Sequence, residues 1–120
     1  MPYRLQMRDD GILRIDFAGG TLERDEVDDF LRDFRAYLDA VTPEVPLRAL
    51  TIAPQLGTKL LSNTRKAFAE INHDPRLGKA ATVSTDRYTH VLVGFILKAT
   101  RRDNIRFFES EEEALAWLQA

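Results

Sequence analysis

The sequence predicts an α/β domain built on a mixed, mostly parallel sheet. Two segments near the N-terminus, 3–8 and 13–17, alternate apolar and polar residues with period two, which indicates half-buried strands. After them, short strand-like segments alternate with longer amphipathic ones, as is typical of strands joined by crossover helices. The expected order is β-β-α-β-α-β-α-β-α, and the length of 120 residues fits one domain over 1–120.

The two N-terminal strands are expected to form a hairpin. Asp10-Gly11 lies between them, and Asp-Gly is a strong signal for a tight turn because the favoured turn needs positive φ at both central residues. One face of this hairpin is apolar and the other is charged. We therefore expect it to lie toward an edge of the sheet.

The first helix is expected over 22–38. Gly19-Gly20 ends the second strand, and Thr21 is a candidate N-cap. Acidic residues crowd the first turns, where the helix dipole favours anions. We interpret them as a solvated surface rather than a metal site, because one helix face does not make carboxylates converge. Apolar residues recur at helical spacing: Leu22, Val27, Phe30, Leu31, Phe34, Tyr37 and Leu38.

The middle of the chain predicts one more strand and one more helix. Two prolines, Pro43 and Pro46, end the first helix and fill a connecting loop. The segment 47–53 is mostly apolar without strict alternation, as expected of a strand covered on both faces. A second amphipathic stripe over 60–71 predicts a helix, and 72–78 is expected to be a polar loop.

The stretch from Lys79 to Leu118 organises the predicted fold. We expect a strand at 79–84, a helix at 86–101, a strand at 105–108 and a helix at 110–118, where Ser110 and Glu113 form a capping box. This order requires a parallel pair of strands with a helix crossing one face. Periodicity alone does not exclude a strand for 90–97, but the length of the segment and its position between two strands favour a helix.

Composition limits the possible functions. The chain has no cysteine, which excludes disulfides, thiolate metal sites and cysteine nucleophiles. Its net charge is −2 with the signs interspersed, so no global field favours nucleic acid. The N-terminus has no apolar signal core, and the longest apolar run, 91–97, is far short of the roughly 20 residues that span a bilayer. We expect a cytoplasmic protein of bacterial type that does not span a membrane.

The closing stretch resembles that of STAS domains and of SpoIIAA-like bacterial proteins. A short strand ending in Phe (105–108) runs into an acidic turn (110–113) and an Ala-Leu-x-Trp-Leu helix (114–118), and the element order of the whole chain is also similar. The resemblance implies a STAS-like fold and a role in protein interaction or small-ligand binding, not a reaction. One departure is that the stretch 53–58 lacks the Asp of the phosphorylatable turn in anti-sigma-factor antagonists.

Several local signals have both a functional and a plain structural interpretation. Gly57, Thr58 and Lys59 open a helix whose free N–H groups can hold an anion, and Thr58 offers a hydroxyl for phosphorylation, but a simple hydroxyl cap is the better reading. His73-Asp74 suits a general base, although a turn formed by Asp74-Pro75 is favoured. His90 is interpreted as a core or interface residue. Five cations are read as a solvated face: Lys59, Arg65, Lys66, Arg101 and Arg102.

The segment 86–101 is the sharpest feature, because it is apolar nearly all round. We expect it to bury against a second subunit in a homodimer, within a non-enzymatic interaction module that has no cofactor or metal and whose protein partner is unknown. The second possibility is a pocket for a small apolar ligand or lipid, as in the SEC14-type domains that this family resembles in outline. The plain structural alternative is that the C-terminal helix and the first helix cover the segment within one chain. Either the dimer contact or the pocket would involve Tyr88, Val91, Leu92, Phe95 and Ile96.

Overall fold

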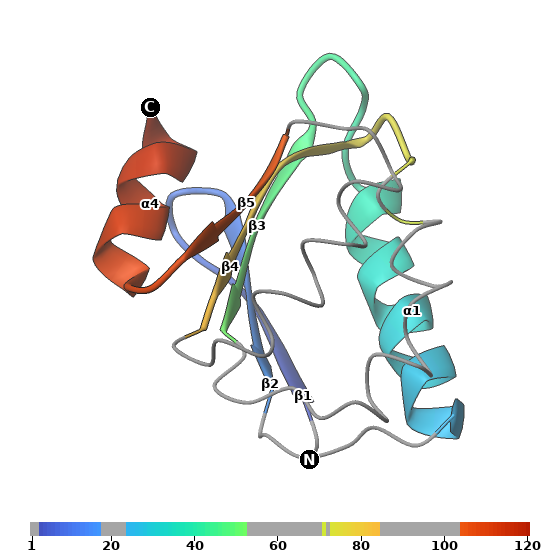
Figure 1. The fold of residues 1–120 in the computed structure, drawn as a ribbon. Helices are drawn as coiled ribbons and strands as arrows, with labels where there is room; N and C mark the ends of the chain where they lie inside the picture. The colour runs from blue at the N-terminus through green and yellow to red at the C-terminus, as the bar shows by residue number, and fades with distance from the viewer. Residues whose placement is uncertain (1–2, 18–23, 53–70, 72, 85–103) are drawn as a thin grey trace.

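The computed structural model describes residues 3–17, 24–52, 71, 73–84 and 104–120. Within these ranges the chain forms strands and two helices (Figure 1), which are β1 (Tyr3–Met7), β2 (Ile12–Phe17), α1 (Arg24–Asp39), β3 (Leu47–Ile52), β4 (Leu77–Val83), β5 (Ile105–Phe108) and α4 (Glu111–Gln119). The expected helix 86–101, and 60–71 except for Ile71, lie outside the described residues.

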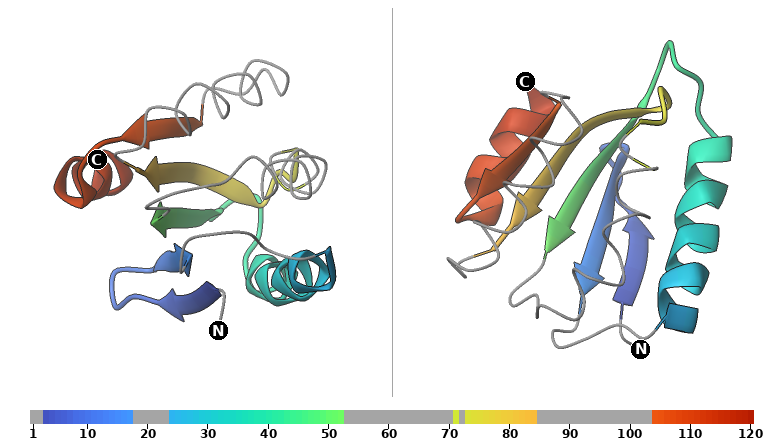
Figure 2. Two further views of the ribbon diagram at one scale, coloured as in Figure 1. Left: turned by 60° about the horizontal axis from the view of Figure 1, so that its bottom comes forward. Right: turned by 45° about the vertical axis from the view of Figure 1, so that its right-hand side comes forward.

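The strands form one mixed, mostly parallel sheet in the order β1-β2-β3-β4-β5. β1 is antiparallel to β2, and every other neighbouring pair is parallel. This confirms the predicted α/β class and the predicted parallel pairing of β4 with β5. Helix α1 packs on one face of the sheet and α4 on the other, hereafter the α1 face and the α4 face (Figure 2).

The hairpin between β1 and β2 turns at the predicted position. Gly11 has a φ of 81°, which an L side chain rarely adopts. The Gly11 amide donates to the Arg8 carbonyl at 3.1 Å, and the Arg8 amide donates to the Ile12 carbonyl at 2.9 Å. The Asp10 carboxylate accepts from the Ile12 amide at 3.2 Å, which closes the turn.

Strand β4 begins at Leu77, two residues before the predicted start at Lys79. Leu77 pairs with Leu47 across the sheet and is only 2% exposed, so burial draws it into the strand. Gly78 lies between Leu77 and Lys79 in the strand. A Cβ on Gly78 would lie 3.0 Å from Pro46 Cγ and 3.3 Å from the Leu47 carbonyl oxygen. Glycine therefore allows β4 to approach the entry of β3 closely.

The first core lies between α1 and the sheet. Val27, Phe30, Phe34 and Leu38 recur at helical spacing and are all buried, which confirms the predicted apolar stripe. Phe30 lies at the centre of this core. The centroid of its ring is 5.3 Å from that of Tyr3, 5.4 Å from that of Phe17 and 5.9 Å from that of Phe34. These edge and tilted geometries are the favoured ones for aromatic pairs.

The second core lies between α4 and the other face of the sheet. Leu50 and Ala81 from the central strands pack with Ala114 and Leu118 from the helix, and all are 1% exposed or less. The helix begins at the predicted cap, because the Glu113 amide donates to the Ser110 hydroxyl at 3.2 Å. At the other end, Arg48 Nη1 donates to the Leu118 carbonyl at 3.1 Å, where a helix dipole favours a cation.

Tyr3 links β1 to α1, and the ionisation of its hydroxyl makes the stability of the fold depend on pH in the alkaline range. Its hydroxyl donates to Asp33 Oδ2 at 2.8 Å. Burial, and then the hydrogen bond to Asp33, raise the pKa of Tyr3 from 10.0 to about 12. Because the folded-state pKa is the higher one, this contribution is fully present below about pH 10 and is lost as the pH approaches about 12.

The expected result is that the stability advantage of the natural chain over Tyr3→Phe shrinks as the pH rises. Urea unfolding of both proteins between about pH 9 and about pH 12 measures the difference in the free energy of unfolding. Using the difference removes the titration of other groups, which both proteins share. A constant advantage across this range would contradict the role given to the Tyr3 hydroxyl.

Candidate functional site

The carboxyl ends of β2, β3 and β4 lie at one edge of the sheet, because these neighbouring strands are parallel. They end at Phe17, Ile52 and Val83, which together define what we call the carboxyl edge. In open parallel sheets, ligands bind in the crevice outside the carboxyl ends of the strands. We therefore take this edge as the candidate functional site.

Both predicted site stretches follow strands that end at the carboxyl edge. Gly57, Thr58 and Lys59 come after β3, and the predicted ligand or interface residues come after β4. The two strands are neighbours in the sheet, so the chain leaves the sheet for both stretches side by side. The stretches themselves lie outside the described residues, and these are Gly57, Thr58, Lys59, Tyr88, Val91, Leu92, Phe95 and Ile96.

On the α1 face, the described residues next to this edge form a row with two hydroxyls and an aromatic ring. Thr51 pairs with Thr82, and Thr82 pairs with Phe107, so the three side chains lie on the same face of neighbouring strands. All three are half-buried. No local sequence signal marks these three residues, because a residue's neighbours across a parallel sheet depend on register, which the sequence pattern does not give.

Ser84 lies at the same edge, directly after β4. It is buried, with 2% of its surface exposed. Its amide donates to the Phe108 carbonyl at 3.1 Å, so the backbone continues the β4–β5 ladder beyond the last strand residue. With the hydroxyls of Thr51 and Thr82, the Ser84 hydroxyl is the third that we describe next to the carboxyl edge.

The His73-Asp74 pair forms a turn, as the sequence analysis favoured. Asp74 Oδ1 accepts from the Arg76 amide at 2.9 Å, and the Leu77 amide donates to the Asp74 carbonyl at 3.1 Å. Asp74 Oδ2 also accepts from Arg76 Nη2 at 2.7 Å. The carboxylate is thus directed to Arg76, and the His73 side chain is exposed.

Arg76 joins this turn to the end of α1. Its Nη1 donates to Asp39 Oδ1 at 2.6 Å, in addition to its bonds with Asp74. The hydrogen bonds to these two carboxylates raise the pKa of Arg76 above its already high ordinary value. The guanidinium is therefore a permanent cation that fixes the entry of β4 against the helix, rather than a group for proton transfer.

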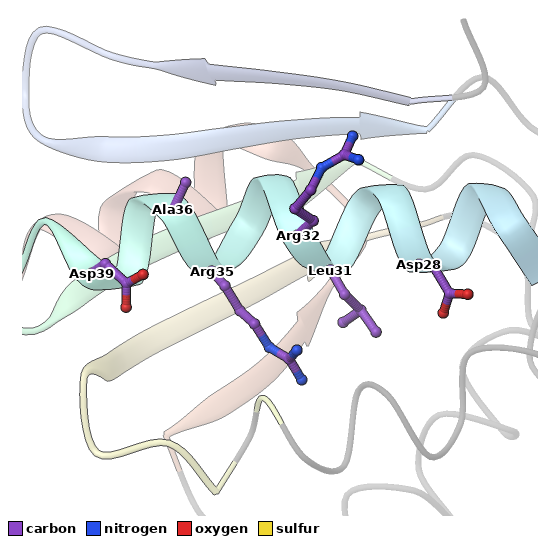
Figure 3. A pocket seen from close by; sticks show the side chains of 6 residues that line it. All are labelled: Asp28, Leu31, Arg32, Arg35, Ala36 and Asp39. Atoms are coloured by element: carbon purple, nitrogen blue, oxygen red, sulfur yellow. The ribbon is translucent and has the colours of Figure 1, made fainter.

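A shallow groove runs along the outer side of α1 (Figure 3). Its volume is about 430 Å³, and it is lined by Asp28, Leu31, Arg32, Arg35, Ala36 and Asp39. Leu31 and Ala36 supply apolar surface between charged side chains of both signs. Figure 3 shows Asp28, Leu31 and Arg35 extending from one side of the helix, whereas Arg32 extends on the side of the β1–β2 hairpin. Such a mixture suits contact with another protein more than enclosure of a small molecule.

Trp117 on α4 is flanked by two cations that the sequence analysis did not bring together. Lys79 Nζ and Arg106 Cζ each lie 5.3 Å from a Trp117 ring centroid, within the range of cation–π attraction. Phe108 packs beside the indole at 5.7 Å. Lys79 also donates to the Trp117 carbonyl at 3.0 Å, so its role is to hold the end of α4 on β4. The predicted cationic face of five other residues lies outside the described residues.

The described part of the chain offers neither a metal site nor a membrane-spanning helix. Among those residues no group of three or more His, Asp or Glu side chains is placed to hold a metal ion. None of the helices in the same ranges is both long and apolar enough to cross a membrane.

Comparison of the chain with protein-family models, with curated proteins and with solved structures gave no match.

Proposed function

We propose that this chain is a non-enzymatic protein-interaction and regulatory module of STAS-like fold. The observation that carries the proposal is that both predicted site stretches leave neighbouring parallel strands at the carboxyl edge, the usual location of binding sites in such sheets. The hairpin at the start, followed by parallel strands in chain order, also supports a STAS-like arrangement.

Within this proposal, the apolar segment 86–101 forms the contact between two copies. Its sequence has more apolar surface than a helix needs when it covers one sheet face. It follows β4, whose inner residues Ala81 and Val83 are already covered on the α4 face by Ala114 and Leu118. In the proposed homodimer, a helix that follows β4 would therefore pack on the α1 face, and its opposite side would contact the second copy.

A small apolar ligand is the second candidate, and one observation favours it. The row of Thr51, Thr82 and Phe107 offers half-buried apolar surface with hydroxyls beside it, next to the carboxyl edge. Ligand sites commonly combine apolar walls with a few placed polar groups. A fatty acid or similar lipid would fit that chemistry.

Native mass spectrometry of the freshly purified full chain separates these candidates. We expect twice the chain mass with no added mass, and we expect Leu92→Asp to give the single-chain mass because a buried charge breaks the contact. Ala116→Asp adds the same charge at an exposed position of α4 and serves as the matched control. A single-chain mass for the natural protein across micromolar concentrations would remove the dimer, and a co-purified lipid mass would favour the second candidate.

A further inference from the structure

β1 is the outermost strand on its side of the described sheet (Figure 2), where it pairs with β2 alone. The Arg8 amide bonds to the Ile12 carbonyl at 2.9 Å, so Arg8 and Ile12 form a hydrogen-bonded pair. Such pairs alternate with non-bonded pairs along an antiparallel ladder. Arg4 and Gln6 therefore also direct their backbone groups toward β2, and the N–H and C=O groups of Leu5 and Met7 point outward.

The side chains of β1 divide between two faces. Arg4, Gln6 and Arg8 lie on the α4 face, and the register places Arg4 opposite Asp16 on β2. Arg4 is exposed, and Arg8 has an ion pair with Asp10 at 3.2 Å. Gln6 is exposed as well, because α4 packs mainly over β3, β4 and β5 and meets the hairpin at Arg14 and at the turn, through Glu111 and Gln119.

On the α1 face the same strand offers apolar surface. Leu5 is half-buried, and Met7 is one of the large apolar side chains with high exposure, at 41%. Arg32 on α1 is paired with carboxylates of its own helix, with Nη1 3.4 Å from Asp29 Oδ1 and Nε 3.6 Å from Asp33 Oδ1. An added strand would thus meet apolar contacts on the α1 face and the arginines Arg4 and Arg8 on the α4 face.

A second copy of the chain is a poor occupant of this edge. Consider two β1 strands paired antiparallel with Leu5 opposite Leu5 of the copy. The outward N–H and C=O groups of the two strands can then bond to each other, and Arg4 lies opposite Gln6 of the copy. Arg4 then lies diagonally, at roughly 7–8 Å, from Arg4 and Arg8 of the copy, so four guanidinium groups crowd one face. Shifting the register by two residues is worse, because it brings arginines directly opposite one another. Charged side chains on an edge strand commonly prevent self-pairing in this way.

We propose that the outer edge of β1 docks an extended segment of a partner protein in which acidic residues alternate with apolar ones. Its backbone would bond to the outward groups of Leu5 and Met7, which is the strand-addition mode of peptide recognition. Its acidic side chains would face Arg4 and Arg8, and its apolar side chains would lie against Leu5 and Met7. The proposed docking uses no residue of the carboxyl edge or of segment 86–101, so the inference and the proposed function can fail independently.

Fluorescence anisotropy with a labelled Glu-Val-Glu-Val-Glu-Val-Glu peptide and the full chain tests the docking. We expect saturable binding that weakens with added salt, and no binding of the matched Lys-Val peptide. N-methylation of the peptide backbone at alternate residues on one edge should abolish binding, because it removes the donors that an added strand needs. Failure of the Glu-Val peptide to bind, or binding that N-methylation leaves unchanged, would overturn the inference.

A pair of charge reversals localises the site. Arg4→Glu should weaken the binding of the Glu-Val peptide about tenfold, since it replaces an attraction by a repulsion. Arg106→Glu makes the same charge change on β5, at the opposite side of the described sheet, and should leave binding within about twofold. Equal effects of the two reversals would show a nonspecific charge effect and would overturn the inference.

Amide hydrogen exchange provides a readout that does not depend on affinity. In the free protein the Leu5 and Met7 amides should exchange fast while the Gln6 amide, which bonds to β2, is protected, and the peptide should slow exchange at Leu5 and Met7. Protection of Leu5 and Met7 in the free protein would mean that a second copy, or another part of the chain, already pairs with this edge. That result would also overturn the inference.

Discussion

Phe30→Ala is expected to lower the free energy of unfolding by about 3–5 kcal/mol, the largest effect of any single substitution proposed for this chain. The Phe30 ring is 2% exposed and contacts the rings of Tyr3, Phe17 and Phe34. Truncation removes the transfer free energy of the ring and leaves a cavity that three other aromatic rings cannot close without leaving their own positions.

Urea unfolding followed by circular dichroism measures this effect. Ala36→Ser on the exposed side of the same helix is the control, and it should change the free energy of unfolding by no more than about 0.5 kcal/mol. A cost below about 1.5 kcal/mol for Phe30→Ala would mean that the site collapses around the smaller residue, and would contradict the central role given to this ring.

Leu118→Ala should cost about 2–5 kcal/mol, because Leu118 is the buried residue by which the end of α4 packs on the sheet. The side chains of Arg48 and Lys79 donate to the carbonyls of Leu118 and Trp117, at 3.1 Å and 3.0 Å. These bonds would keep the end of α4 in place when the side chain at position 118 is shortened. They therefore oppose an inward movement of the helix that would fill the space. Ala116→Ser, on the exposed side of α4, is the matched control.

The two truncations lie on opposite faces of the sheet, so their costs should add within about 0.5 kcal/mol in the double variant. Urea unfolding of the natural chain, the two single variants and the double variant completes the cycle. A coupling above about 1 kcal/mol would show that the sheet transmits repacking from one core to the other. If the double variant is unfolded in water, the milder pair Phe30→Leu and Leu118→Val gives the same test.

The elements that the sequence predicts well are those with strong local signals. The Asp10-Gly11 turn, the stripe through Phe30 and Phe34, and the Ser110 cap each depend on residues a few positions apart, and all three are confirmed. The sequence places the start of β4 two residues too far along the chain, at Lys79 instead of Leu77. Leu77 joins the strand through its pairing with Leu47, a residue distant from it in the sequence.

The surroundings of the candidate site were harder to predict for the same reason. The row of Thr51, Thr82 and Phe107 comes from three strands, and it exists only once their register is known. The two cations at Trp117 come from β4 and β5, and neither is near the tryptophan in sequence. The predicted residues 57–59, and those between 88 and 96, remain predictions.

The sequential order of the strands has a consequence for how this chain acquires its structure. Each strand from β2 onward pairs with the strand just before it, and no later strand inserts between two earlier ones. During synthesis, the sheet can therefore be extended outward from the hairpin as each segment leaves the ribosome, without reopening a pairing already made. Of the two described helices, α4 packs on β3, β4 and β5 together and follows the last strand in the chain, so its docking would come after the described sheet is complete.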